Sequence, residues 1–147
     1  MNPQAADCEL CTQPGGEVVH RNADYRVLLV DDANYPGFCR IIWNAHVREM
    51  TDLSATERAA LMDAVWQVEE AVRAAMQPDK VNVASLGNVV PHLHWHVIPR
   101  YRDDAHFPNP IWGERRRDTP QAVLEERHAR AAQLRKNLLA RFGQPQL

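Results

Sequence analysis

The alternation of apolar and polar residues, together with short apolar runs, predicts a sheet of five strands. The first four strands are expected at residues 17–21, 25–30, 38–43 and 81–86. The second and third are separated by the turn-rich segment 31–37. A fifth strand is predicted over residues 92–98, where apolar side chains alternate strictly with histidines.

Two helices are predicted from apolar residues at spacings of three and four. Ser54 and Glu57 form a capping-box pattern at the start of the first, whose apolar stripe is Leu61, Val65, Val68, Val72 and Met76. The second helix is expected to start with Thr119 at its N-cap and Pro120 in its first turn, and to stop at Gly143. Its expected stripe is Val123, Leu124, Leu134, Leu138 and Phe142.

The fifth predicted strand contains the candidate catalytic residues. His92, His94 and His96 are expected on one face, with the intervening apolar side chains in the core. An imidazole titrates near pH ~6.5, so such a row offers a neutral nucleophile beside a protonated donor at neutral pH. This suits a phosphate ester as substrate. Two other interpretations stay open, hydrogen-bonded structural histidines and three ligands of one metal ion.

Composition narrows the class of protein. The chain has 147 residues, 45% of them apolar, which fits one domain with a substantial core. A net charge of −2 predicts neither a nucleic-acid nor a membrane surface, although residues 100–147 are net positive and can steer an anionic substrate. Three cysteines argue against a disulfide framework and favour a reducing cytoplasm. We expect no signal peptide and no transmembrane segment.

The segment from Gly87 to Arg100 resembles the signature of the histidine triad superfamily, in which three alternating histidines precede two apolar residues and a Pro-Arg pair. The resemblance extends upstream and covers roughly residues 8–101. It implies an α+β fold with an antiparallel sheet, one main helix and a C-terminal helix. It also implies a homodimer with a continuous sheet. We expect a single domain over 1–147, with 102–147 as a C-terminal extension of loop and helix.

The resemblance further implies a nucleotidyl hydrolase that cleaves at the α-phosphorus of a dinucleoside polyphosphate or a nucleoside phosphoramidate. His94 would be the nucleophile, His96 would bond the phosphate oxygens or the departing atom, and His92 would fix the geometry. Three alternatives are a nucleotidyltransferase, a nucleotide-binding or signalling module with weak activity, and a metallohydrolase. The last lacks an accompanying carboxylate pattern.

Three substrate-binding residues are expected from the same resemblance. Asp31 would accept the ribose hydroxyls, Asn82 would contact phosphate or ribose, and Asn88 would contact phosphate. Asn88 stands where many members have Gln, and Val89 where many have a hydroxyl residue. These departures affect the expected leaving-group preference rather than the class of reaction.

Cys8 and Cys11 form a Cys-x-x-Cys pair in a stretch that is expected to be loop. Alone, the pair fits half a zinc site, a redox pair or chance. The resemblance implies a structural zinc site completed by His46 and His92, and no organic cofactor. Cys39 is expected in the core.

Trp112 lies in a proline-rich loop in the C-terminal extension. One interpretation is that this loop closes over the nucleotide, from the same or the partner subunit. The other is that Trp112 anchors the loop on the core.

Overall fold

The computed structural model describes residues 5–143. Its elements run in the order α1 (Glu9–Thr12), β1 (Glu17–Arg21), β2 (Tyr25–Leu29), β3 (Cys39–Trp43), a 3-10 helix (Met50–Asp52), α2 (Ala55–Met76), β4 (Lys80–Ala84), β5 (His94–Arg100) and α3 (Gln121–Phe142). The five strands form one sheet in the order β1-β2-β3-β5-β4, and every neighbouring pair is antiparallel. The predicted α+β class is therefore confirmed.

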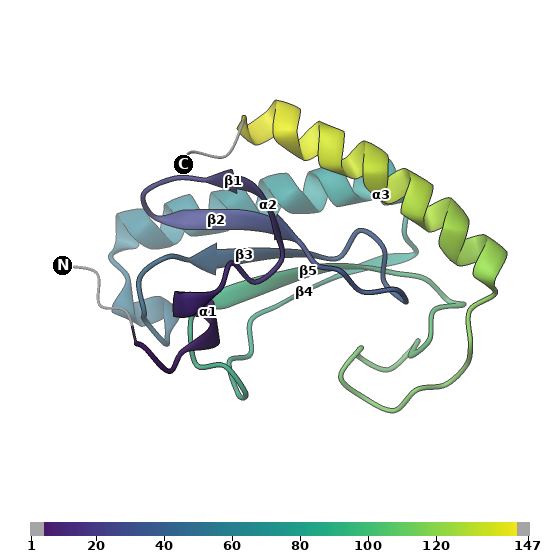
Figure 1. The fold of residues 1–147 in the computed structure, drawn as a ribbon, viewed down its shortest axis with the longest axis horizontal. Helices are drawn as coiled ribbons and strands as arrows, with labels where there is room; N and C mark the ends of the chain where they lie inside the picture. The colour runs from purple at the N-terminus through teal and green to yellow at the C-terminus, as the bar shows by residue number, and fades with distance from the viewer. Residues whose placement is uncertain (1–4, 144–147) are drawn as a thin grey trace.

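The two long helices cover one face of the sheet, and α1 lies on the other face (Figure 1). All five predicted stripe positions of α2 are buried in the core between sheet and helices. The capping box is present, because the Ser54 hydroxyl accepts from the Glu57 amide and the Glu57 carboxylate accepts from the Ser54 amide. The helix ends at Gln77, whose backbone is left-handed.

The C-terminal helix starts later than predicted. Pro120 is its N-cap and Gln121 its first residue, so the assignment of Thr119 as the cap is wrong. The Thr119 hydroxyl instead donates to the carbonyl of Asp103 at 2.8 Å, and Thr119 lies one residue before the N-cap. The helix stops at Gly143 as expected, at a φ of 87° that favours glycine.

The segment between β5 and α3 is irregular but held by a buried ion pair. Arg100 donates to both carboxylate oxygens of Asp104, at 2.8 and 3.0 Å. The same carboxylate accepts from the hydroxyl of Tyr35 and from the backbone amides of residues 101, 106 and 107. Because every acceptor direction is used, Asp104 fixes the path of this segment along the edge of the candidate site.

Candidate active site

The sheet face opposite α2 and α3 carries two adjacent imidazoles from β5. His94 pairs with Ile42 of β3, and His96 pairs with Arg40. Ile42 packs with α1 on this face, whereas Val97 packs with the helices. The rings of His94 and His96 meet edge to face, with centroids 4.9 Å apart. The predicted alternation holds for these two histidines.

The prediction that His92 belongs to this strand is wrong, although its ring lies on the same side of the sheet as the other two. β5 begins at His94, and His92 lies in a bend before it. Its backbone N–H donates to the carbonyl of Val90, which closes a tight turn around Pro91 instead of extending the ladder. The turn directs the ring toward the N-terminal cysteine pair, so His92 contributes to a different cluster.

Backbone carbonyls fix which nitrogen of each ring carries the proton. The Nδ1 of His94 is bonded to the carbonyl oxygen of His92, and the Nε2 of His92 to that of Trp43. Because a carbonyl oxygen only accepts, these two nitrogens are the donors. The neutral His94 ring therefore has its lone pair on Nε2, and the neutral His92 ring has its lone pair on Nδ1.

Burial makes both site imidazoles neutral in the free protein. It lowers the pKa of His96 to about 3, with further contributions from the charges of His94 and Arg40. Burial also lowers the pKa of His94. The expectation of a protonated donor already present beside the nucleophile is therefore wrong for the free protein. The Nδ1 of His96 is buried and has no hydrogen-bond partner among the described residues.

The N-terminal cysteines meet two histidines on the same side of the sheet. The thiol of Cys8 is 3.4 Å from Nδ1 of His92, and that of Cys11 is 3.5 Å from the same atom and 3.4 Å from Nδ1 of His46. All four potential ligand atoms lie within 4.8 Å of one another. These are the four residues predicted to form a zinc site.

The cluster fits a tetrahedral metal ion. Metal–sulfur and metal–nitrogen bonds of zinc imply S···N separations of about 3.6 Å, close to those observed. The lone pair on Nδ1 of His92 faces the thiols, which is the tautomer that coordination requires. Cys8 precedes a four-residue helix, α1, so the expectation of loop throughout is corrected. Among residues 5–143, His94 and His96 belong to no metal-ligating cluster, which disfavours one ion shared by the three histidines.

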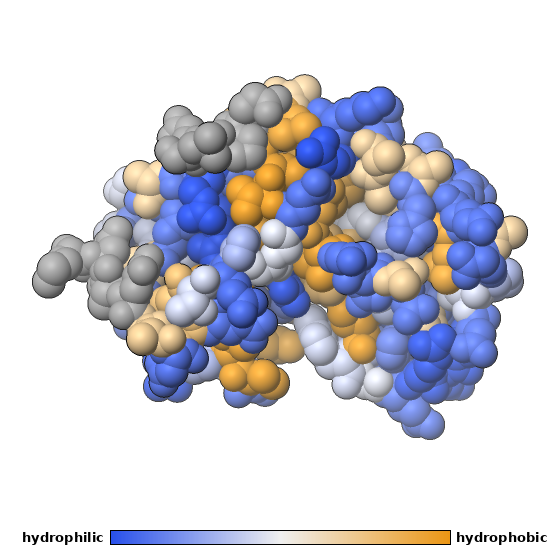
Figure 2. Space-filling view, viewed as in Figure 1, coloured by the Kyte–Doolittle hydropathy of each residue, from blue (hydrophilic) through white to orange (hydrophobic). Residues whose placement is uncertain are grey.

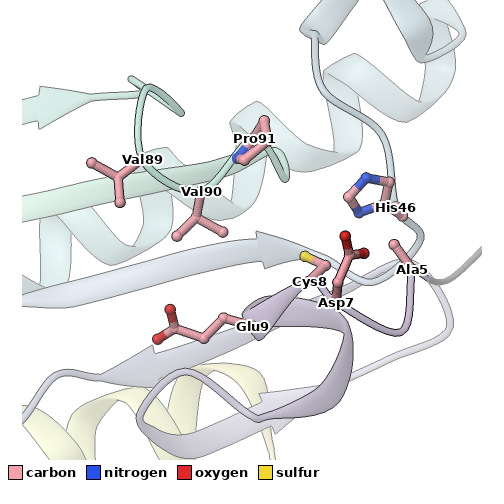
Figure 3. Close-up of a pocket in the computed structure, with 8 residues that line it drawn as sticks. All are labelled: Ala5, Asp7, Cys8, Glu9, His46, Val89, Val90 and Pro91. Carbon is pink, nitrogen blue, oxygen red and sulfur yellow. The ribbon is translucent and has the colours of Figure 1, made fainter.

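A cavity of about 330 Å³ adjoins the cysteine–histidine cluster. Figure 3 shows the Cys8 thiol between the His46 ring and Val90, with the Glu9 carboxylate directed away from them. Val89 and Pro91 line the cavity from the loop after β4, and neither His94 nor His96 does. The cavity therefore borders the cysteine–histidine cluster and is not lined by the imidazole pair.

The imidazole pair lies on a face with a hollow. Figure 2 shows this hollow. On one side of it lie α1 and the loop after β4, and on the other side lies the segment between β5 and α3. Trp112 comes from that last segment, and its ring contacts His96 edge to face at 5.1 Å. Its side chain is 49% exposed. Trp112 thus borders the site from the same chain and is not anchored in the core.

The predicted substrate-binding residues are dispersed around this face. Asn82 pairs with Ile98 on β5, and its side-chain oxygen accepts from Arg100 at 2.7 Å, which leaves its NH2 group to donate. Asp31 is exposed just beyond β2. Asn88 is exposed in the loop after β4. Among residues 5–143, neither Asp31 nor Asn88 forms a hydrogen bond with the imidazoles.

Sequence reasoning missed Arg40, which lies across from His96 on β3. It is the one charged residue in the apolar run 38–43, and this was the available signal. The reasoning also missed the Arg100–Asp104 pair. Its members are only four residues apart, but Asp104 lies in an irregular segment after β5, where no periodic pattern indicates that the two side chains meet.

Comparison with known proteins identifies the family. The HIT domain matches residues 13–103, more than half of the chain, and the chain belongs to the HIT domain family. An AP-4-A phosphorylase of Mycobacterium tuberculosis (strain H37Rv) is 29% identical over 137 residues. The match covers 89% of this chain but only 66% of that relative's length.

Solved structures agree with this assignment. A histidine triad protein from Bradyrhizobium japonicum superposes with a TM-score of 0.72 at 29% identity, covering 92% of this chain and 99% of that one. A histidine triad protein from Marinobacter aquaeolei gives 0.69 at 25% identity with the same coverage. Within residues 5–143, no helix is both long and apolar enough to span a bilayer.

Proposed function

We propose that this protein is a nucleotidyl hydrolase acting at the α-phosphorus of a dinucleoside polyphosphate or a nucleoside phosphoramidate. The observation that carries the proposal is the fixed tautomer of His94. Its Nδ1–H is held by the backbone, so the Nε2 lone pair is free for attack on phosphorus. Family membership supplies the nucleotide class of the substrate.

The reaction has two displacements. In the first, Nε2 of His94 forms a bond to the α-phosphorus while the bond from phosphorus to the leaving group breaks. His96, which is neutral in the free protein, would take up a proton from solvent when the anionic substrate binds beside it and would pass that proton to the departing atom. In the second, water attacks phosphorus and gives a proton to His96, which is neutral again; the N–P bond breaks, and the nucleoside monophosphate leaves. His92 holds the geometry through its carbonyl and does not react.

An apolar cluster next to His96 supports a nucleoside pocket. Tyr35, Phe38 and Ile98 are buried together on this face, and the Phe38 ring lies 5.5 Å from that of His96. We assign base and ribose to this region, with Asp31 for the ribose hydroxyls. Asn82 and Asn88 are assigned to phosphate or ribose. Trp112 would cover the bound substrate.

A second candidate is nucleotidyl transfer to inorganic phosphate. The name of the mycobacterial relative favours it. The first displacement is unchanged, and phosphate replaces water in the second. With diadenosine tetraphosphate, hydrolysis gives AMP and ATP, whereas transfer to phosphate gives ADP and ATP. Product analysis with and without orthophosphate therefore separates the two.

We further propose that the cysteine–histidine cluster holds a structural zinc ion. The donor set of two thiols and two imidazoles, with matching separations, supports this assignment. The ion would fasten the N-terminal arm to the start of β5. It supplies no step of the reaction.

We also propose a homodimer with a continuous sheet. The β1 edge is covered by α3, while β4 is the other edge of the sheet. Leu86 just beyond β4 and Trp66 on α2 are exposed large apolar residues. A solution mass equal to one chain at micromolar concentration would reject the dimer.

His94→Asn tests the catalytic assignment. Asn keeps a polar group of similar reach but has no nucleophilic nitrogen. Turnover of diadenosine tetraphosphate is expected to fall by at least about 10³-fold, with AMP affinity largely retained. His128→Asn, on the exposed side of α3, is the matched control and should be fully active. Unchanged turnover in His94→Asn would reject the mechanism.

A further inference from the structure

We infer that Arg40 is a phosphate-binding residue of this site, placed to contact the phosphoryl oxygens of a nucleotide beside His94 and His96. The inference rests on the proposed nucleotide chemistry and adds a residue that the histidine signature does not include. Arg40 is the register partner of His96 across β3 and β5. It therefore extends from the same face as the imidazole pair.

The surroundings of Arg40 do not explain its charge. Its neighbours on this face of β3 are Phe38 and Ile42, both buried in apolar clusters. Among residues 5–143, no carboxylate lies within ion-pair distance of it. Its only hydrogen bond there runs from Nη1 to the carbonyl of Gly15 at 3.0 Å. The guanidinium carbon lies 5.7 Å from the centre of the Phe38 ring, and the negative charge of Glu9 acts on Arg40 from beyond ion-pair distance. A half-buried cation without a direct ion-pair partner is unfavourable unless an anion completes the site.

Two buried nitrogens in this part of the sheet lack partners. They are Nε of Arg40 and Nδ1 of His96, two of only three such side-chain atoms within residues 5–143. Buried polar atoms are normally satisfied, so an unpaired pair on adjacent strands indicates a ligand. The Nη2 group of Arg40 also has no hydrogen-bond partner among the described residues but is not buried, so it is the guanidinium group that a phosphate oxygen can reach first.

Arg26 shows what a purely structural arginine looks like on this same face. It lies on β2 as the register partner of Ile42. Its Nε, Nη1 and Nη2 all donate to protein oxygens, those of Pro14, Asn44, Leu10 and Gln13. Arg26 uses four of its five N–H donors in this way and fastens the N-terminal arm. Arg40 makes one such contact and leaves the rest of its fork free.

The test compares AMP with adenosine as ligands, using calorimetry on the full chain. Arg40→Met removes the guanidinium with its charge and keeps an unbranched stem in its place. We expect the dissociation constant for AMP to rise on the order of 10- to 100-fold, and that for adenosine to change less than about 2-fold. Arg40→Lys keeps the charge but loses the planar fork of the guanidinium. Its dissociation constant for AMP should therefore lie between those of the wild type and Arg40→Met. Arg135→Met, on the exposed side of α3, controls for net charge.

Each outcome is decisive. If the wild type binds AMP and Arg40→Met binds it equally well, the inference is wrong while the proposed function stands. If AMP and adenosine affinities fall together, with a lower melting temperature and less bound metal, Arg40 only supports the arm through Gly15. If Arg40→Met does not fold, the Arg40→Lys variant decides. An unchanged ratio of its dissociation constants for AMP and adenosine overturns the inference. If the wild type itself does not prefer AMP to adenosine, the proposed function and this inference both fail.

Discussion

His92 and His94 are joined by a hydrogen bond from the Nδ1 of His94 to the main-chain carbonyl of His92. The ring of His92 faces the cysteine pair, while its carbonyl sets the orientation of the candidate nucleophile. One residue therefore connects the cysteine–histidine cluster to the imidazole pair. Loss of the cluster is expected to disturb the site although no metal ligand takes part in the reaction.

Cys8→Ser and Cys11→Ser test this connection. Each variant is expected to lose most of the bound zinc, to melt at a lower temperature, and to lose about 10- to 100-fold in turnover. Metal analysis, thermal melting and steady-state kinetics provide the three readouts. Cys39→Ala is the matched control, since that thiol is buried in the main core. It should keep its zinc. Wild-type protein purified without chelator and holding well under one zinc per chain would contradict the account.

Trp112→Ala tests whether the indole of Trp112 covers the bound substrate. The indole contacts His96 and is half exposed, so its removal should raise the KM for diadenosine tetraphosphate about 10-fold and change the melting temperature little. Trp66 on α2 has the same exposure, 49%, on the helical layer. Trp66→Ala should leave KM unchanged. Equal KM values for the two variants would place Trp112 outside the substrate site.

The Arg100–Asp104 pair predicts acid sensitivity. Burial alone would raise the pKa of the Asp104 carboxyl, but the bonds from Arg100 and three backbone amides lower it to about 2, from 3.8. A lowered folded-state pKa stabilises the fold above about pH 4. That stability, about 2 kcal/mol, is lost as the pH falls toward 2.

Asp104→Asn tests this prediction through denaturant unfolding at several pH values. The variant leaves Arg100 buried without a counter-charge and should lose about 3–5 kcal/mol at pH 7. Its stability should then decline less steeply than that of the wild type between pH 4 and 2. Parallel stability curves for the two proteins would contradict the lowered pKa.

Much of this fold is predictable because its signals are local. Alternation and helical spacing placed the strands and α2 to within two residues, and the capping box fixed the start of α2. The misplaced features depend on distant partners. Thr119 satisfies a carbonyl in an earlier segment instead of capping α3. His92 leaves the strand because a turn around Pro91 directs its ring to the cysteines.

The site shows the same division. The four residues of the cysteine–histidine cluster were predicted from a family resemblance, and the structure brings all four together. Arg40 was not predicted, because the role of a single charged residue within an apolar run is ambiguous until its strand partner is known. Electrostatics was the least predictable property. The neutral state of His96 depends on burial and on the neighbouring charges of His94 and Arg40, none of which spacing reveals.

The central claim is that Nε2 of His94 becomes covalently bonded to phosphorus. Its most direct test is rapid quenching of the wild-type protein with diadenosine tetraphosphate, followed by peptide mapping by mass spectrometry under conditions that preserve a phosphorus–nitrogen bond. The account predicts an adenylyl group on the peptide that contains His94, formed within the first turnover and lost on the timescale of product release. Full turnover with no adduct at any quench time, or an adduct on a different residue, would contradict it.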